Sequence, residues 1–297
     1  RPAPDVEAIA FPAEGPRTNG LVVVKDGAIV FERYAGKFGP DVPHIFWSGT
    51  KSVLHALYGR AVMEGLVDID QSFADRSPWI GDGKMSKLTY RHLLQMSSGL
   101  SFNEAYEYAP LRSSIIAMLY TTGHDDMAHY AADRPLLAAP GTLWSYKGGD
   151  TLILSAGLRD VVGAERYTDY PWTALFDPLG MQGVVFERDG AGTFVASSYL
   201  YATPRDLARL GLLYLRDGCW AGQRLLPEGW VESARRLASA LEDPPAEPFW
   251  HAWLGLGPAS YGEHWWLNRK RSDGQQPYPG LPEDVLVAAG HWGQMLW

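Results

Sequence analysis

Apolar and polar positions alternate along the chain with two periods, and the period changes near residue 48. Residues 21–34 contain two apolar runs, rich in β-branched side chains, on either side of Asp26-Gly27. Such runs around an Asp-Gly pair, which readily adopts positive φ, predict a β-hairpin. From Ser48 to a closing glycine, Gly65, the apolar positions recur at helical spacing and predict a helix. These positions are Val53, Leu54, Leu57, Tyr58, Ala61 and Val62.

The middle of the chain, from about residue 68 to residue 238, favours helices. Candidate helices with an amphipathic pattern or a polar N-cap cover residues 89–96, 112–120, 150–162 and 204–216. Two later apolar runs, at residues 265–268 and 285–289, are typical of strands.

Strands at both ends with helices between them predict a mixed α/β (α+β) fold. We expect an antiparallel sheet built from both termini, flanked by helices, with an inserted, mainly helical lobe. The corresponding regions are 1–66 with 255–297 for the sheet and 67–254 for the helices.

Composition narrows the classes of function. The 297 residues are 46% hydrophobic and 20% charged, which suits a sizeable core. The net charge of −8 argues against a broad basic surface for nucleic acid. Cys219 is the only cysteine, which excludes an intrachain disulfide and Cys-rich zinc sites. The twelve Trp and fifteen Tyr fit either core packing or an aromatic-lined cleft for an apolar substrate.

The sequence is compatible with more than one cellular location. No apolar run is long enough to span a membrane. The first residue is Arg1 rather than Met, so a signal peptide can have been removed, and the periplasm or secretion is slightly favoured over the cytoplasm. The oligomeric state cannot be predicted from the pattern.

The first candidate motif is Trp47-Ser48-Gly49-Thr50-Lys51, at the start of the predicted helix. A nucleophilic serine needs a base within hydrogen-bond reach, and spacing i, i+3 puts Lys51 on the same helical face as Ser48. The N–H of Ser48 can donate to an oxyanion because the start of a helix leaves it without an intrahelical partner. A lysine base also requires burial or a nearby cation to lower its pKa. The non-catalytic alternative is that Ser48 is an ordinary helix N-cap and that Lys51 is a solvent-exposed lysine.

The second motif is a Gly-rich loop, residues 140–149, that carries Tyr146 and Lys147. A phenol beside the serine can relay its proton if an ammonium group such as that of Lys51, assisted by Lys147, makes the phenolate accessible. Taken alone, Tyr146 also fits a half-buried structural aromatic.

The third motif, Gly290-His291-Trp292-Gly293-Gln294, ends an apolar strand. Flanking glycines let a substrate lie close to the strand backbone, and the N–H of Gln294 can complete an oxyanion hole opposite Ser48. Taken alone, His291 also fits a structural histidine.

In this order, the three motifs resemble those of the class C β-lactamase and D-Ala-D-Ala peptidase superfamily. The similarity is closest to the branch of family VIII carboxylesterases and 6-aminohexanoate-oligomer hydrolases. It extends to residues 92–100 (His-Leu-Leu-Gln-Met-Ser-Ser-Gly-Leu), residues 201–214, Tyr261-Gly262 and Trp265-Trp266.

The resemblance implies a β-lactamase/transpeptidase fold and an acyl-enzyme mechanism. Ser48 would acylate, Lys51 and Tyr146 would handle its proton, the N–H groups of Ser48 and Gln294 would hold the oxyanion, and water would deacylate. The expected substrate-binding positions are Trp47, Gly148, His291, Trp292 and Gly293, and we expect no cofactor and no metal. Because this family continues past its H-x-G strand, we also expect a C-terminal strand and helix to be missing.

Departures from the family pattern bear on the substrate. Gly148 stands where β-lactamases usually carry an Asn that binds the acylamino group, and His291-Trp292 replaces a Lys and a hydroxyl residue. These losses favour a small ester or amide with an apolar acyl part over a β-lactam. The enzyme alternative is a true β-lactamase or D-Ala-D-Ala carboxypeptidase, and the non-enzyme alternative is an inactive ligand-binding or scaffold protein of the same fold.

Other hydrolase classes fit less well. An α/β-hydrolase would need a G-x-S-x-G elbow and a zincin would need H-E-x-x-H, and the chain has neither. His124 and His129 are spaced i, i+5, which does not put both imidazoles on one helical face as a metal site there would need.

Overall fold

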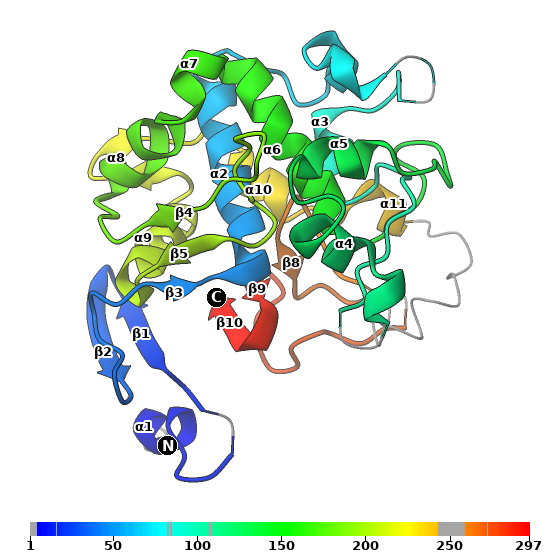
Figure 1. The fold of residues 1–297 in the computed structure, drawn as a ribbon. Helices are drawn as coiled ribbons and strands as arrows, with labels where there is room; N and C mark the ends of the chain where they lie inside the picture. Colours follow the sequence, from blue (N-terminus) through cyan, green and yellow to red (C-terminus); the bar gives the residue numbers. More distant parts are fainter. Residues whose placement is uncertain are drawn as a thin grey trace.

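Two long helices, α2 (Thr50–Met63) and α6 (Gly148–Val162), lie side by side at the centre of the molecule (Figure 1). The computed structural model describes residues 5–15, 17–81, 83, 85–106, 109–242, 259–271 and 273–297. Most side chains of both helices are buried, and the hydroxyl of Tyr58 on α2 donates to the carbonyl of Leu154 on α6. Gly157 allows the close approach of Phe73, because a Cβ there would lie 2.5 Å from the Phe73 ring. The core therefore forms around this helix pair.

Sequence expectations for the helices are confirmed. The pattern from Ser48 gives a short 3₁₀ turn, η1 (Trp47–Gly49), that leads directly into α2. Candidate helices appear as α3 (Tyr90–Leu94), α4 (Ser114–Tyr120), α6 and α9 (Pro204–Leu215). Thr89, Ser113 and Thr203 cap three of them by accepting a backbone N–H, as side-chain oxygens at the N-cap do.

Shorter helices complete the helical part. They are α1 (Val6–Ala10), α5 (Met127–Ala132), α7 (Ala164–Tyr167), α8 (Asp177–Leu179), α10 (Trp230–Ala234) and α11 (Ser239–Glu242), with η2 (Phe73–Asp75), η3 (Pro78–Ile80), η4 (Pro110–Arg112) and η5 (Trp172–Phe176). None of the helices in the described part of the chain has the length and apolarity that a bilayer crossing requires.

The strands pair antiparallel in small sheets. The predicted hairpin is confirmed as β1 (Gly20–Lys25) and β2 (Ala28–Tyr34), with positive φ at both turn residues, Asp26 and Gly27. Near the C-terminus, β9 (Leu286–Gly290) lies between β8 (Trp266–Leu267) and β10 (Gln294–Leu296). The remaining strands are β3 (His44–Ile45), β5 (Leu200–Ala202) and β4 (Val185–Phe186) in one sheet, and β6 (Cys219–Trp220) with β7 (Gln223–Arg224).

This architecture confirms the expected mixed α/β fold class. The terminal strands form separate ladders within the described residues rather than one continuous sheet, and strands β4 to β7 lie in the stretch expected to be mainly helical. The region boundaries stay a prediction, and residues 254 and 255 lie outside the described residues. Both β9 and β10 lie against η1, at the start of α2 (Figure 1). This contact brings the first and third motifs together.

Candidate active site

Ser48 lies in a tight turn that is packed over a buried ring. The preceding residue, Trp47, has φ 48°, in the left-handed region that non-glycine residues seldom adopt. The following residue, Gly49, leaves room for the side chain of Phe46, because a Cβ there would lie 2.4 Å from the Phe46 ring. The turn thus holds Ser48 at the entrance to α2.

Lys51 directs its amine at Ser48. Its Nζ lies 3.0 Å from Ser48 Oγ and 3.0 Å from the backbone oxygen of Ser197, and the residue is only 1% exposed. The same Nζ lies 4.9 Å from the centre of the Tyr146 ring. The structure therefore brings together the three residues predicted to carry the chemistry, with the amine away from bulk water.

Tyr146 lies just before α6, against an aromatic wall. Its ring stacks on Trp266 at 5.2 Å and meets Tyr261 edge-on at 5.8 Å. Tyr261 and Trp266, one from each of the segments 261–262 and 265–266, thus orient the phenol ring.

The segment 92–100 packs against the loop that carries Tyr146 and binds it by hydrogen bonds. Its carbonyl at Met96 accepts the N–H of Ser145, and its carbonyl at Leu100 accepts from Lys147 Nζ at 3.3 Å. The structural role of this segment is therefore to hold the two residues that flank Tyr146.

Lys147 is buried and faces an acid rather than solvent. Its Nζ is 3.9 Å from Asp150 Oδ2, and Ser98 Oγ donates to the other oxygen of Asp150 at 2.6 Å. Burial lowers the pKa of Lys147, and the negative charges of Asp150 and Glu104 oppose this. The sequence suggests that Lys147 assists Tyr146. In the structure the Lys147 amine instead contacts Asp150 and the carbonyl of Leu100.

Glu104 is a site residue that the sequence motifs did not reveal. Its Oε2 accepts the N–H of Gly148 at 2.7 Å, and within the described part of the chain its Oε1 has no hydrogen-bond partner. Burial raises the pKa of Glu104, against the positive charge of Lys51 and the Gly148 N–H, which lower it. A lone Glu in a loop without motif spacing gives no sequence signal for this role.

Gly148 itself is crowded. A Cβ there would lie 2.8 Å from Ile115 Cδ1 and 3.4 Å from Glu104 Oε1. The space beside Tyr146 in which an Asn side chain would have to start is therefore filled by an apolar group and a carboxylate.

The third motif lies at the end of β9, which packs against the turn that carries Ser48. Gly290 adopts an extended conformation, and a Cβ there would lie 2.1 Å from the carbonyl oxygen of Phe46. Beyond it, Trp292 (φ 61°) and Gly293 (φ 79°) are left-handed, and Gln294 returns in register with Gly290. This reversal places residues 291–294 next to the Ser48 turn.

Aromatic rings gather around His291 at this junction. The imidazole stacks on Tyr106 at 5.2 Å and contacts the edges of Trp47 at 5.9 Å and Trp292 at 4.8 Å. Trp292 is 76% exposed, so it stands at the rim rather than inside. Tyr106 was not predicted, and it contributes an apolar face to the same rim.

No metal-binding group accompanies these residues. In the described ranges, no three His, Cys, Asp or Glu side chains converge as a metal site would require. His124 instead lies beside the adjacent residue Asp125, and His129 lies beside Asp126, three residues before it.

A mixed α/β fold that joins a Ser-x-x-Lys turn, a tyrosine loop and an H-x-G strand end defines the penicillin-recognising, β-lactamase-like class of proteins. The chain belongs to the Beta-lactamase family, whose family model matches residues 14–297.

Individual relatives agree with this assignment. The 6-aminohexanoate-dimer hydrolase of Paenarthrobacter ureafaciens is 26% identical over an alignment of 290 residues, and the match covers 94% of this chain and 69% of the relative. A putative 6-aminohexanoate-dimer hydrolase from Bacillus anthracis superimposes with a TM-score of 0.71 at 21% identity, covering 93% of this chain and 69% of the other. A β-lactamase from Mycobacterium bovis gives a TM-score of 0.61 at 18% identity, with 91% and 78% covered. The two structural similarities show the shared fold.

Proposed function

We propose that the chain is a serine hydrolase that cleaves small esters or amides through an acyl-enzyme. The observation that carries this proposal is the 3.0 Å contact between Lys51 Nζ and Ser48 Oγ, made by an amine that is almost fully buried. A serine hydroxyl becomes nucleophilic when a positioned base accepts its proton, and this pair has the required reach.

In the proposed reaction, Lys51 acts as a neutral amine: Ser48 Oγ attacks the substrate carbonyl while its proton passes to Lys51 Nζ, which becomes an ammonium group. The N–H groups of Ser48 and Gln294 are proposed to stabilise the oxyanion. Tyr146, next to the Lys51 amine, would pass the proton to the leaving alcohol or amine. A water molecule then attacks the acyl-enzyme and releases the acid, which restores Ser48.

Two features support small esters or amides over β-lactams. Gly148 has no side chain to bind an acylamino group, and Ile115 occupies the space beside it. The aromatic rim of Trp47, Tyr106 and His291 offers apolar surface for an acyl chain. A family relative is named for hydrolysing a 6-aminohexanoate dimer, which supports including aliphatic amides in the substrate class.

The test is a panel of short p-nitrophenyl esters, aliphatic amides and nitrocefin on the purified protein, together with a fluorophosphonate probe. We expect turnover of esters or amides well above that of nitrocefin, and probe labelling that disappears in Ser48→Ala. Nitrocefin turnover that rivals the esters would favour a true β-lactamase. A wild-type protein that neither labels nor turns over any substrate would favour a binding or scaffold protein.

A further inference from the structure

His264 has a backbone conformation that is unusual for its residue type. It precedes β8 and adopts φ 57°, in the left-handed region. Only a few per cent of non-glycine residues do so, although histidine is among the enriched types. The residue is 2% exposed, so no solvent contact accounts for its place. Its hydrogen bonds give the reason for this conformation.

Two of these bonds reach the first turn of α2. His264 Nδ1 lies 3.1 Å from the carbonyl oxygen of Lys51. A carbonyl only accepts, so Nδ1 carries the proton and donates it. The backbone oxygen of His264 in turn accepts from Ser52 Oγ at 2.7 Å. Side chain and backbone of one residue thus hold two consecutive residues of the helix that begins beside Ser48.

A third contact reaches the first turn of α6. With its proton on Nδ1, the imidazole has only Nε2 left as an acceptor, and the hydroxyl of Thr151 lies 3.4 Å from it. Burial, and after it the positive charge of Lys51, holds the pKa of His264 well below its usual value, so the ring is neutral at pH 7. The neutral imidazole therefore bridges the helix after Ser48 and the helix after Tyr146.

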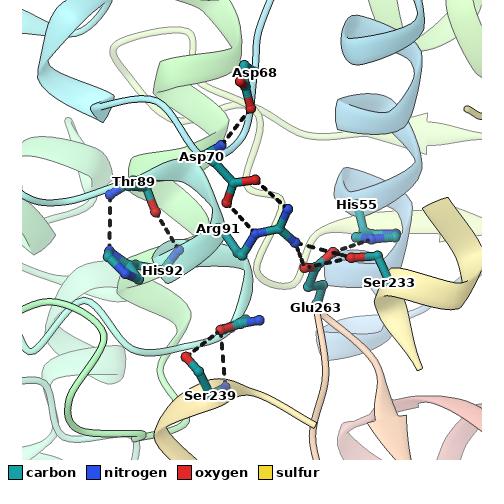
Figure 2. Close-up of polar contacts among 10 residues, drawn as sticks. His55, Asp68, Asp70, Thr89, Arg91, His92, Ser233, Ser239 and Glu263 are labelled. Carbon is teal, nitrogen blue, oxygen red and sulfur yellow. Dashed lines mark hydrogen bonds and ion pairs between the residues drawn. The ribbon is translucent and has the colours of Figure 1, made fainter. Parts of the chain in front are cut away.

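The neighbouring residue anchors the same turn on its other side. The Glu263 carboxylate accepts hydrogen bonds from Arg91 and Ser233 (Figure 2). His55 Nε2, on α2, lies 3.6 Å from the same carboxylate. The N–H of His264 donates to the carbonyl of Leu94 at the end of α3, at 2.9 Å. These contacts hold the turn in place and stabilise the left-handed conformation of His264. The bonds from His264 to Lys51 and Ser52 therefore fix the start of α2 relative to this turn.

We propose that His264 is a positioning residue that fixes the Lys51 end of the catalytic pair by binding the backbone of the first turn of α2. This role rests on the proposed serine-hydrolase function for its effect on turnover, but not for its effect on the helix. His264 touches neither Ser48 Oγ nor Lys51 Nζ, so it acts through the backbone that carries them.

Two substitutions separate the donor from the backbone conformation. His264→Asn places an amide N–H near the position of Nδ1 and tolerates left-handed φ, so it keeps the bond to Lys51. His264→Gly also tolerates the backbone conformation and keeps the bonds to Ser52 and Leu94, but it removes the donor. Both variants tolerate the backbone conformation and both lose the Nε2 contact to Thr151, whereas only His264→Asn retains a donor for the carbonyl of Lys51.

The first measurement is hydrogen exchange at the amides of residues 50–55. We expect faster exchange in His264→Gly than in wild type, and near wild-type exchange in His264→Asn. Unchanged exchange in His264→Gly would overturn the proposal, whether or not the protein turns over any ester. This readout keeps the inference separate from the substrate assignment.

The second measurement is kcat and KM per folded active site, on whichever substrate wild type turns over and Ser48→Ala does not. We expect His264→Gly to lower kcat by roughly 10- to 100-fold with little change in KM, because a small misplacement of a catalytic group has that effect. His264→Asn should recover most of the loss. Equal losses in both variants, or a change confined to thermal stability, would mean that His264 only supports the fold.

Discussion

Buried charge is the dominant feature of the site at the scale of single residues. Lys51, Lys147 and Asp150 are each at most 1% exposed, and Glu104 adds a carboxylate beside Gly148. Removing ions from water is costly unless opposite charges or hydrogen bonds compensate. Lys147 has Asp150, whereas the amine of Lys51 is directed at the Ser48 hydroxyl and a backbone carbonyl. Among the described residues, no carboxylate lies within ion-pair distance of the Lys51 amine, which contacts the hydroxyl of the proposed nucleophile.

The prediction at this scale concerns Lys51 and Tyr146, the two residues proposed to transfer the proton. Lys51→Ala and Tyr146→Phe should each lower kcat/KM for an ester substrate by at least about a hundredfold, the lower range for loss of a general acid–base group. Steady-state kinetics on the purified variants checks this. Tyr278→Phe is a suitable control, since that ring packs against Trp297 and is not among the described rings that contact Tyr146. Near-normal activity in Lys51→Ala would remove the proposed base.

At the scale of elements, the site depends on the contact between η1 and the end of β9. Gly290 has φ −109°, which any residue can adopt, so glycine is not needed there for backbone freedom. It is needed because the carbonyl of Phe46 lies where a Cβ would be. A single missing side chain therefore allows the H-x-G strand end to approach the Ser48 turn.

Substitution at this contact should affect both stability and activity. We expect Gly290→Ala to lower the free energy of unfolding by about 1–3 kcal/mol, as overpacking does, and to reduce esterase activity by displacing residues 291–294. Gly39→Ala is the matched control, because its Cβ would meet nothing closer than 3.9 Å. Denaturant unfolding and activity of both variants give the comparison. If both behave as wild type, the close approach is not needed.

At the scale of the whole molecule, buried neutral histidines link stability to pH. Burial lowers the pKa of His55 and of His264, although Glu263 opposes the shift at His55. An unfolded histidine takes up a proton near pH 6.5, whereas the folded one does not. Unfolding therefore binds protons below that pH, and this contribution to stability is present above pH 6.5 and lost as the pH falls.

A comparison of wild type with His264→Asn separates the effect of the His264 imidazole on stability from the effect of the titrating carboxyl groups. Wild type and His264→Asn share every other titrating group, so only the imidazole differs between them. We expect the stability of wild type relative to the variant to fall below pH 6.5, by up to about 1.4 kcal/mol per pH unit. Denaturant unfolding at several pH values from 8 to 5 measures the difference. Parallel curves would show that His264 takes up a proton at the same pH in the folded protein as in the unfolded chain.

The sequence by itself determined the local elements and the contact between Ser48 and Lys51. Helix caps such as Thr89 and Thr203, the Asp26-Gly27 turn, and the i, i+3 spacing of Ser48 and Lys51 depend on interactions within a few residues. Periodicity and spacing describe such interactions directly.

Only the tertiary structure decided what surrounds that pair. Glu104 and Tyr106 reach the site from one loop and His264 from the turn before β8, and the sequence motifs assigned no role to any of the three. The terminal strands likewise form separate ladders, since register across distant segments depends on packing rather than on local pattern. Contacts between distant segments depend on how the whole chain packs, and a one-dimensional pattern does not contain that information.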